Sequence, residues 1–260
     1  MAAVQWFLIA LIGAGVGFLG GMFGKGGSAI ATPLLAAVGV SPILAVASPL
    51  PATIPGTLVA YRRYRGSGFS DPRVIRWSVG FGLPATIVGA LVTHWVGGGF
   101  LVRLTDVIVA LLGLRIVLEH RGRGRRGRRD RDGAVVPSDR STVTAVRLAA
   151  VAAMVGFLAG LLANAGGFLL VPLYLAVLKL PIKRALANSL AVASMLAVPG
   201  TFVHASLGHI DWAVAGVFGL ASIPLSGIGA RTALAMQPER LELIYGLGLL
   251  VLGSSLLFVG

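Results

Sequence analysis

Residues 15–42 read GVGFLGGMFGKGGSAIATPLLAAVGVSP, and residues 156–181 read GFLAGLLANAGGFLLVPLYLAVLKLP. When the two stretches are aligned at an offset of 139 residues, Gly27 falls on Gly166. The match continues at an offset of 139 or 140 in residues that break or cap helices: Pro33 and Pro172, Pro42 and Pro181, Gly68 and Gly208, Asp71 and Asp211, Pro84 and Pro224, and, across a small gap, Pro55-Gly56 and Pro199-Gly200. Chance does not place so many such residues in one order, so the chain is an internal two-fold duplication.

The composition indicates that this duplicated chain lies in lipid. Of its 260 residues, 56% are hydrophobic and 12% are charged, whereas soluble domains carry roughly 25% charged residues. A soluble protein of this size could not hide so much apolar surface from water. A helix of ~20 apolar residues spans a bilayer, and continuous rather than alternating hydrophobicity excludes barrel strands. We therefore predict an all-α polytopic membrane protein.

Each half contains five apolar segments, at residues 4–23, 28–39, 43–61, 73–96 and 101–118 and at residues 147–163, 168–179, 184–205, 211–230 and 240–259. The second segment of each half corresponds to ~18 Å of helix, which is too short to span alone. It follows a Gly-rich break, so the first two segments are predicted to form a helix–break–half-helix hairpin, either spanning or re-entrant. An odd number of crossings per half inverts the second half. The prediction is two inverted five-segment repeats, at residues 1–120 and 147–260, joined by an Arg/Gly-rich linker at 121–146.

The positions of the basic residues test this inversion independently, because cytoplasmic loops of membrane proteins are enriched in Lys and Arg. Of the 22 Lys and Arg residues, 19 lie in four loops, at residues 62–76, 119–147, 179–184 and 231–240. The predicted outside loops contain none; they are residues 40–43, 97–100 and 206–211. The two termini also contain none. We predict that the four basic loops are cytoplasmic and that both termini are outside.

The net charge of +13 does not by itself indicate a nucleic-acid partner. Much of it lies in the run Arg121–Arg131 (RGRGRRGRRDR), which a cytoplasmic loop explains. Anionic lipid headgroups are the predicted partners of this run, and no nucleic acid is predicted to bind. The chain has no cysteine, so disulfides and thiolate metal sites are excluded. No cofactor or metal is predicted.

The two Gly-rich breaks, Gly21–Pro33 and Leu162–Pro172, are the candidate substrate site. Inverted repeats with broken helices hold substrates near the midplane, where half-helix N-termini point at an anion. A helix N-terminus presents unpaired N–H groups and partial positive charge, and glycines let the backbone approach the ligand. Half-helices that start at Ser28 and Phe168 would supply two such ends facing each other across the pseudo-two-fold axis. A small anion is the predicted substrate.

Individual side chains in and beyond the breaks extend this site. Lys25 falls opposite Asn164 in the repeat, and it either pairs with the anion or snorkels to the inner interface. The third segments supply small polar residues, among them Thr57 and Ser194, which line a cavity or mediate helix contacts. The predicted substrate-binding residues are Gly24, Lys25, Gly26, Gly27, Ser28, Ser48, Pro49, Thr53, Asn164, Ala165, Gly166, Gly167, Asn188 and Ser189.

Other residues narrow the possible functions. His94 and His204 fall near predicted outer helix ends, and Asp106 is expected to pair with Arg103 three residues earlier. Few acidic residues lie at membrane depth. This argues against a cation as the transported substrate, though not against proton coupling. Glycines four residues apart predict close helix packing, as at Gly13, Gly17, Gly21, Gly156 and Gly160.

The paired elements GKGGSAIATP and ANAGGFLLVP, each followed by a further proline, resemble the TauE/SafE family of sulfite exporters and sulfonate-uptake permeases. The resemblance covers nearly the whole chain and implies carriage of small sulfur oxyanions or organosulfonates across a bacterial inner membrane. The family's glycine-rich elements map to Gly24, Gly26, Gly27, Gly166 and Gly167. Lys25 stands where the family usually has an apolar residue, and Ser28 and Ala165 replace glycines; an added Lys fits an anion.

These observations predict a secondary transporter that moves a small sulfur-containing anion by alternating access. A passive anion channel is the alternative within the same class. A membrane-embedded enzyme acting on lipid is a third possibility, but it would need a nucleophile–base pair or acidic metal ligands at membrane depth, and the sequence offers neither. The direction of transport, the coupling ion and a homodimeric state stay open.

Overall fold

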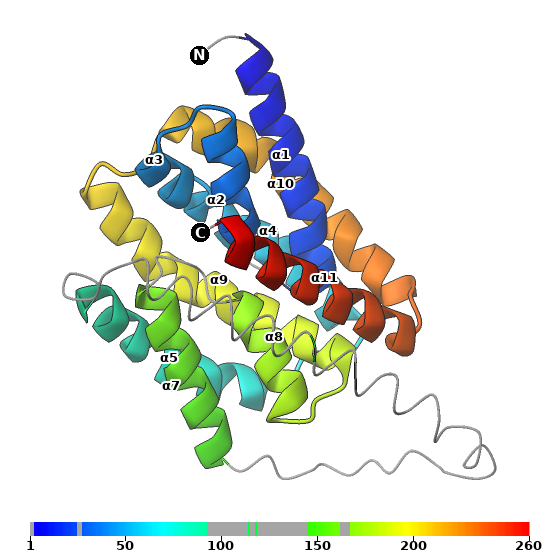
Figure 1. Cartoon of the computed structure of the whole chain (residues 1–260). Helices are drawn as coiled ribbons and strands as arrows, with labels where there is room; N and C mark the ends of the chain where they lie inside the picture. Colours follow the sequence, from blue (N-terminus) through cyan, green and yellow to red (C-terminus); the bar gives the residue numbers. More distant parts are fainter. Residues whose placement is uncertain are drawn as a thin grey trace, which may run out of the picture.

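The computed structural model describes residues 3–24, 28–92, 145–161 and 167–259, together with Leu114 and Leu118. Within these residues every regular element is a helix (Figure 1), which confirms the all-α prediction. The helices are α1 (Ala3–Phe23), α2 (Ser28–Ala37), α3 (Pro42–Ala47), α4 (Leu50–Gly66), α5 (Pro72–Val92), α7 (Ala145–Leu161), α8 (Gly167–Ala176), α9 (Ile182–Ser206), α10 (Trp212–Ala235) and α11 (Pro238–Val259).

Four helical stretches among the described residues are long and apolar enough to cross a membrane: Ala3–Phe23, Ile43–Gly66, Ile182–Ser206 and Trp212–Ala235. Their mean hydropathies lie between 1.6 and 2.0, and large apolar side chains such as Leu220 and Phe202 face outward. Such a surface suits lipid and not water. The chain is therefore a multi-pass membrane protein. The predicted segment at residues 101–118 and the Arg-rich run lie outside the described residues, apart from Leu114 and Leu118.

The apolar segment predicted at residues 43–61 is confirmed as one helical stretch, Ile43–Gly66, with a turn at Ser48 and Pro49 that separates α3 from α4. Pro49 and Pro51 have no backbone N–H, so the carbonyls of Ala45 and Ala47 lose their helical donors. The corresponding helix of the second half, α9, is continuous over 25 residues. At the position that matches Pro49 it has Ser189, whose N–H is available.

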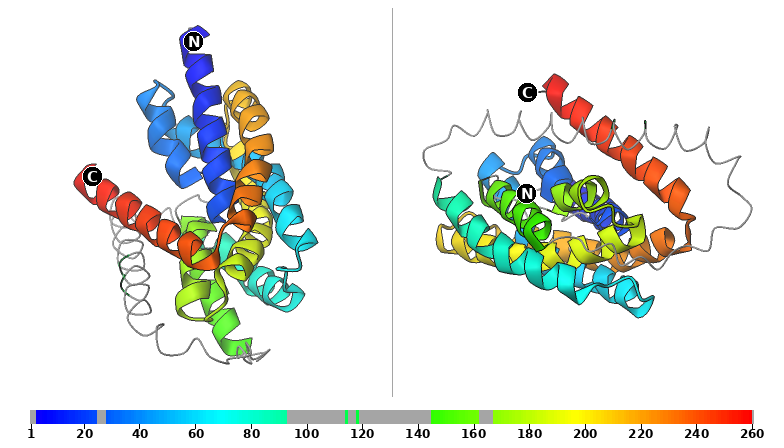
Figure 2. Two further views of the ribbon diagram at one scale, coloured as in Figure 1. Left: turned by 90° about the vertical axis from the view of Figure 1, so that its right-hand side faces the viewer. Right: turned by 90° about the horizontal axis from the view of Figure 1, so that it is seen from below.

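The two halves exchange their first helices. Helix α1 packs along α10 of the second half, and α7 packs along α5 of the first half. Helices α4 and α9 contact each other at the centre, and they also contact α10 and α5 respectively. Figure 1 and the left view of Figure 2 place α1 (blue) beside α10 (orange). Helix α11 lies across the outside of the bundle, where Tyr245 packs on Phe23 with ring centroids 5.7 Å apart.

Glycines make the close approach of α1 and α10 possible. A Cβ atom on Gly17 or Gly21 would overlap the backbone carbonyl of Ser222 or Ser226. On α7 a Cβ atom on Gly156 would overlap the carbonyl of Gly82 in α5. The close packing predicted from the glycine spacing is confirmed at these positions, and it occurs at equivalent positions of the repeat.

The turns before α5 and α10 also match between the halves. Gly68 and Gly208 adopt φ angles of +78° and +70°, in the left-handed region that glycine tolerates. Asp71 and Asp211 then cap the helices. Each carboxylate accepts hydrogen bonds from two backbone N–H groups of the following first turn, at 2.9–3.3 Å. Both helix starts are thereby fixed in the same way.

Candidate functional site

Two predicted site residues, Ser48 and Asn188, tie the halves together through equivalent hydrogen bonds. The backbone N–H of Asp211 donates to Ser48 Oγ at 3.0 Å, and the backbone N–H of Asp71 donates to Asn188 Oδ1 at 2.9 Å. Ser48 and Asn188 are both fully buried. Each therefore accepts a hydrogen bond from the helix-capping aspartate of the other half.

These two contacts lie at opposite ends of α4. Ser48 precedes the first residue of α4, and Asp71 follows its last turn, so the 17-residue helix separates the contacts by about 25 Å. The structure does not bring Ser48 and Asn188 into one cavity. In the repeat, Ser48 corresponds to Asn188 and Asp71 to Asp211, so the offset between the halves is 140 residues at both ends of α4 and α9. The pairing of Pro55 with Pro199 across a gap is therefore wrong.

The first Gly-rich break begins against α9. Gly24 is buried with φ = +69°, and its carbonyl accepts a hydrogen bond from Ser189 Oγ at 3.0 Å. Ser189 Oγ also lies 3.1 Å from the carbonyl oxygen of Leu186. A Cβ atom on Gly24 would lie 2.6 Å from Ser189 Oγ. Two predicted site residues from opposite halves are thus in contact.

The rest of the two breaks lies outside the described residues. Those positions are Lys25, Gly26 and Gly27 in the first break and Asn164, Ala165 and Gly166 in the second. Ser28 begins α2 and Gly167 begins α8, close to the predicted half-helix starts. The binding roles of all these residues stay predictions.

Asn188 has a second feature, on its amide nitrogen. Its Nδ2 atom is buried, and no group among the described residues accepts a hydrogen bond from it. A buried donor without a partner costs about 1–3 kcal/mol. Such groups in native structures call for an explanation, and binding of a ligand is one. Asn188 adjoins Ser189, so this free donor lies close to the start of the Gly-rich break.

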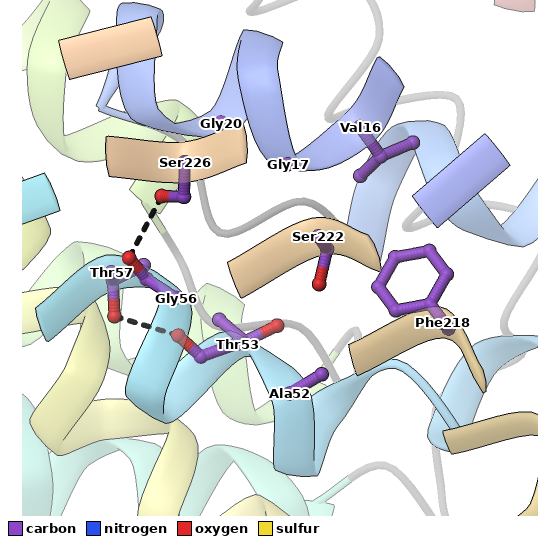
Figure 3. Close-up of a pocket in the computed structure, with 10 residues that line it drawn as sticks. All are labelled: Val16, Gly17, Gly20, Ala52, Thr53, Gly56, Thr57, Phe218, Ser222 and Ser226. Atoms are coloured by element: carbon purple, nitrogen blue, oxygen red, sulfur yellow. Dashed lines mark hydrogen bonds between the residues drawn. The ribbon is translucent and has the colours of Figure 1, made fainter. Parts of the chain in front are cut away.

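In the described part of the chain, a small cavity lies between α1, α4 and α10 (Figure 3). It is lined by Val16, Gly17, Gly20, Ala52, Thr53, Gly56, Thr57, Phe218, Ser222 and Ser226. Its volume of about 20 Å³ holds one water-sized particle. A sulfite ion, with four heavy atoms, is larger than this volume. Of the site residues predicted from the sequence, Thr53 lines this cavity. Gly24 and Ser189 are not part of its lining.

All four hydroxyl groups of this lining donate their hydrogen to backbone carbonyls. Thr53 and Thr57 donate to Pro49 O and Thr53 O at 3.1 and 2.8 Å. Ser226 donates to Gly56 O at 2.7 Å, and Ser222 to Gly219 O at 3.4 Å. Sequence reasoning missed Ser222 and Ser226. The signal available was their spacing of four residues, which places them on one face of a helix.

Three predicted basic loops meet at one end of the molecule. Lys183, in the first turn of α9, donates from Nζ to the carbonyl of Leu234 at 2.8 Å. Its Nζ also lies 5.8 Å from the centroid of the Phe69 ring, within reach of a cation–π contact. Elsewhere, Gln5 Nε2 donates to Val38 O at 3.3 Å, which joins the N-terminal helix to the end of α2.

Comparison with known proteins agrees with this architecture. The probable membrane transporter protein YunE of Bacillus subtilis is 24% identical over 99% of both chains. A probable membrane transporter protein of Xylella fastidiosa is 28% identical, covering 96% of this chain and 94% of its own. No solved structure matches the chain. The sequence model of the family described as "Sulfite exporter TauE/SafE" matches residues 9–256. This nearly complete match agrees with the resemblance carried by the Gly-rich elements, and the chain belongs to the TauE/SafE family of membrane transporters.

Proposed function

We propose that this membrane transporter is a secondary carrier that moves a small sulfur-containing anion, such as sulfite or a sulfonate, across the bacterial inner membrane. The observation that carries the anion assignment is the buried amide donor of Asn188, which has no acceptor among the described residues and lies beside the Ser189–Gly24 contact. Lys25 follows Gly24 directly in the chain. A buried N–H donor, a cation and a half-helix N-terminus are the groups that stabilise an oxyanion. The family description supports the same substrate class.

We propose further that the carrier works by alternating access between two inverted halves. The exchanged packing of α1 on α10 and of α7 on α5 supports a two-fold relation between the halves. The meeting of Lys183, Leu234 and Phe69 supports one cytoplasmic end. The contact of Gln5 with Val38 is consistent with an outside end that holds the N-terminus. The family assignment favours a transporter over an enzyme.

Single cysteines at equivalent turns test the inversion, because the chain has no cysteine of its own. Ser67 and Leu207 both follow the last turn of their helices, and both are exposed. We expect an impermeant maleimide added to intact cells to label Leu207→Cys and to leave Ser67→Cys unlabelled. Permeabilised cells, in which both should react, are the control. Labelling of both variants, or of Ser67→Cys alone, in intact cells rules out the proposed orientation.

Lys25→Ala is expected to weaken anion binding by about 10- to 100-fold, because a charge-assisted hydrogen bond contributes about 1.5–3 kcal/mol. A thermal-shift panel of sulfite, sulfate and methanesulfonate on purified protein measures the loss. Arg231→Ala, which removes one positive charge from an exposed position, is the matched control and should bind normally. Unchanged affinity of Lys25→Ala for every anion would leave snorkelling as the role of Lys25.

Counterflow in proteoliposomes separates a carrier from a channel. Vesicles preloaded with unlabelled sulfite should take up labelled sulfite faster than empty vesicles. The reason is that the binding site of a carrier returns to the outer side of the membrane faster when it is loaded than when it is empty. An open pore gives equal rates with and without the internal anion. Equal rates together with measurable flux would therefore favour the passive anion channel.

A further inference from the structure

We propose that the cavity between α1, α4 and α10 is a binding site for a partly dehydrated monovalent cation of the size of Na⁺, and that this ion is the coupling ion of transport. The coupling role rests on the proposed transport function, whereas the cation site itself rests on the geometry of the cavity.

The chemistry of the cavity wall is that of a cation site. A hydroxyl group has one donor and two acceptor lone pairs. Because Thr53 and Ser222 donate their hydrogens to carbonyls, what their oxygens offer to the cavity is lone pairs. Figure 3 shows the hydroxyl oxygens of Thr53 and Ser222 pointing toward each other across the space. An anion would meet oxygen lone pairs there and be repelled, whereas a cation would be coordinated.

Size and charge restrict the ion further. The volume of about 20 Å³ admits one water-sized particle, so an ion inside it would take oxygen ligands from the wall in place of part of its hydration shell. Among the residues that the structure describes, no Asp or Glu lines the cavity. Ca²⁺ and Mg²⁺ are bound in proteins with the help of carboxylates. A neutral oxygen lining instead suits a single positive charge.

The duplication provides an internal comparison for this site. At the offset of 140 residues, Thr53 and Thr57 correspond to Ala193 and Ala197. Gly56 corresponds to Leu196, which is only 2% exposed and lies 3.4 Å from the position a Cβ atom would take on Gly82. A leucine thus occupies the space that is hollow in the other half. The hydroxyl-lined cavity is confined to one side of the described bundle, and a single cation per chain is the expected stoichiometry.

Helix α1 connects the cavity to the proposed anion site. Gly17 and Gly20 of α1 line the cavity, and the same helix ends one residue before Gly24, which contacts Ser189. A cation held between α1, α4 and α10 would fix the position of α1 and hence of the Gly-rich break. This gives the cation and the anion a mechanical link, and their affinities should then depend on each other reciprocally.

The first test is cation binding to the purified full-length protein with no substrate anion present. NaCl is titrated against choline chloride at constant ionic strength and followed by thermal shift and calorimetry. We expect saturable stabilisation by Na⁺ with a stoichiometry of one, and none by choline. No stabilisation by Na⁺ means that the cavity takes only water and overturns the inference.

Two single variants locate the ion. Ser222→Ala removes a hydroxyl whose bond to Gly219 is long, and Thr53→Val removes a hydroxyl while keeping the side-chain shape. Each is expected to weaken Na⁺ binding at least 10-fold. Thr86→Val is the matched control: its buried hydroxyl also donates to a carbonyl four residues earlier, at the position equivalent to Ser226, and Na⁺ affinity should not change. Wild-type Na⁺ affinity in both Ser222→Ala and Thr53→Val would place the ion elsewhere.

Measuring anion binding in sodium and in choline separates this inference from the proposed function. Coupling predicts that Na⁺ raises sulfite affinity at least 5-fold. If sulfite binds equally well in both salts and undergoes counterflow, transport stands and the coupling cation is overturned. If Na⁺ binds at the cavity but no sulfur anion binds or exchanges, the anion assignment fails and the cation site stands.

Discussion

Gly21→Leu is expected to leave almost no folded protein, the largest effect of any substitution considered. Gly21 faces α10 so closely that a Cβ atom alone would overlap the carbonyl of Ser226. Backbone atoms cannot turn aside as a flexible side chain can, so α1 and α10 must separate along their length. Overpacking of a rigid contact costs about 1–3 kcal/mol or more, and small residues are what allow such helices to associate in lipid. The fraction of monodisperse protein in detergent, measured by size exclusion, reports the loss.

Gly15→Leu is the matched control on the same helix. Gly15 is exposed, and a Cβ atom there would meet nothing within 4 Å. We expect this variant to elute as wild type. Leucine also has a higher intrinsic helix preference than glycine. Equal yields of Gly21→Leu and Gly15→Leu would contradict the close packing of α1 on α10.

Gly24→Ala is expected to destabilise the protein by about 2–4 kcal/mol and to weaken anion binding. A side chain at φ = +69° costs about 1–2 kcal/mol. In addition, the new methyl group would lie 2.6 Å from Ser189 Oγ and 2.9 Å from a methyl carbon of Val171, so neighbours must move. Displacement of Ser189 would also shift Asn188 and its free donor. Thermal unfolding and sulfite titration measure the two effects.

Gly208→Ala separates backbone strain from packing in this comparison. Gly208 has a nearly identical φ of +70°, is exposed, and has nothing within 4 Å of an added Cβ atom. It should lose only the strain of about 1–2 kcal/mol and bind sulfite as wild type does. If Gly208→Ala destabilises as much as Gly24→Ala, packing against Ser189 contributes nothing.

Much of the fold was predictable, because helix breakers repeat and apolar length is a strong signal in lipid. The equivalence of Ser48 and Asn188 was visible from the offset alone. Their partners were not, because hydrogen bonds to Asp211 and Asp71 depend on which half each helix packs against. A sequence repeat alone does not reveal that α1 packs on the second half and α7 on the first.

The break before α4 and the cavity were harder to predict. Pro49 and Pro51 signal a kink, and a turn does separate α3 from α4 there, within the single apolar stretch Ile43–Gly66. Ser222 and Ser226 resemble ordinary small residues at a helix contact. Their role in the cavity depends on Gly56 leaving space beside them, which is a property of three helices together. Lys25 and Asn164, the most conspicuous sequence asymmetry, lie outside the described residues.

The exchange of first helices has a consequence for synthesis. Helix α1 finds its partner α10 only after about 190 further residues have been made, which at ~5–20 residues per second takes about 10–40 s. During that interval the glycine face of α1 has no α10 to cover it. Neither half can close its own bundle, so the native packing of α1 can form only after most of the chain has entered the membrane. A chain that stops after α9 should accordingly remain open to capture by other helices or by quality-control proteases.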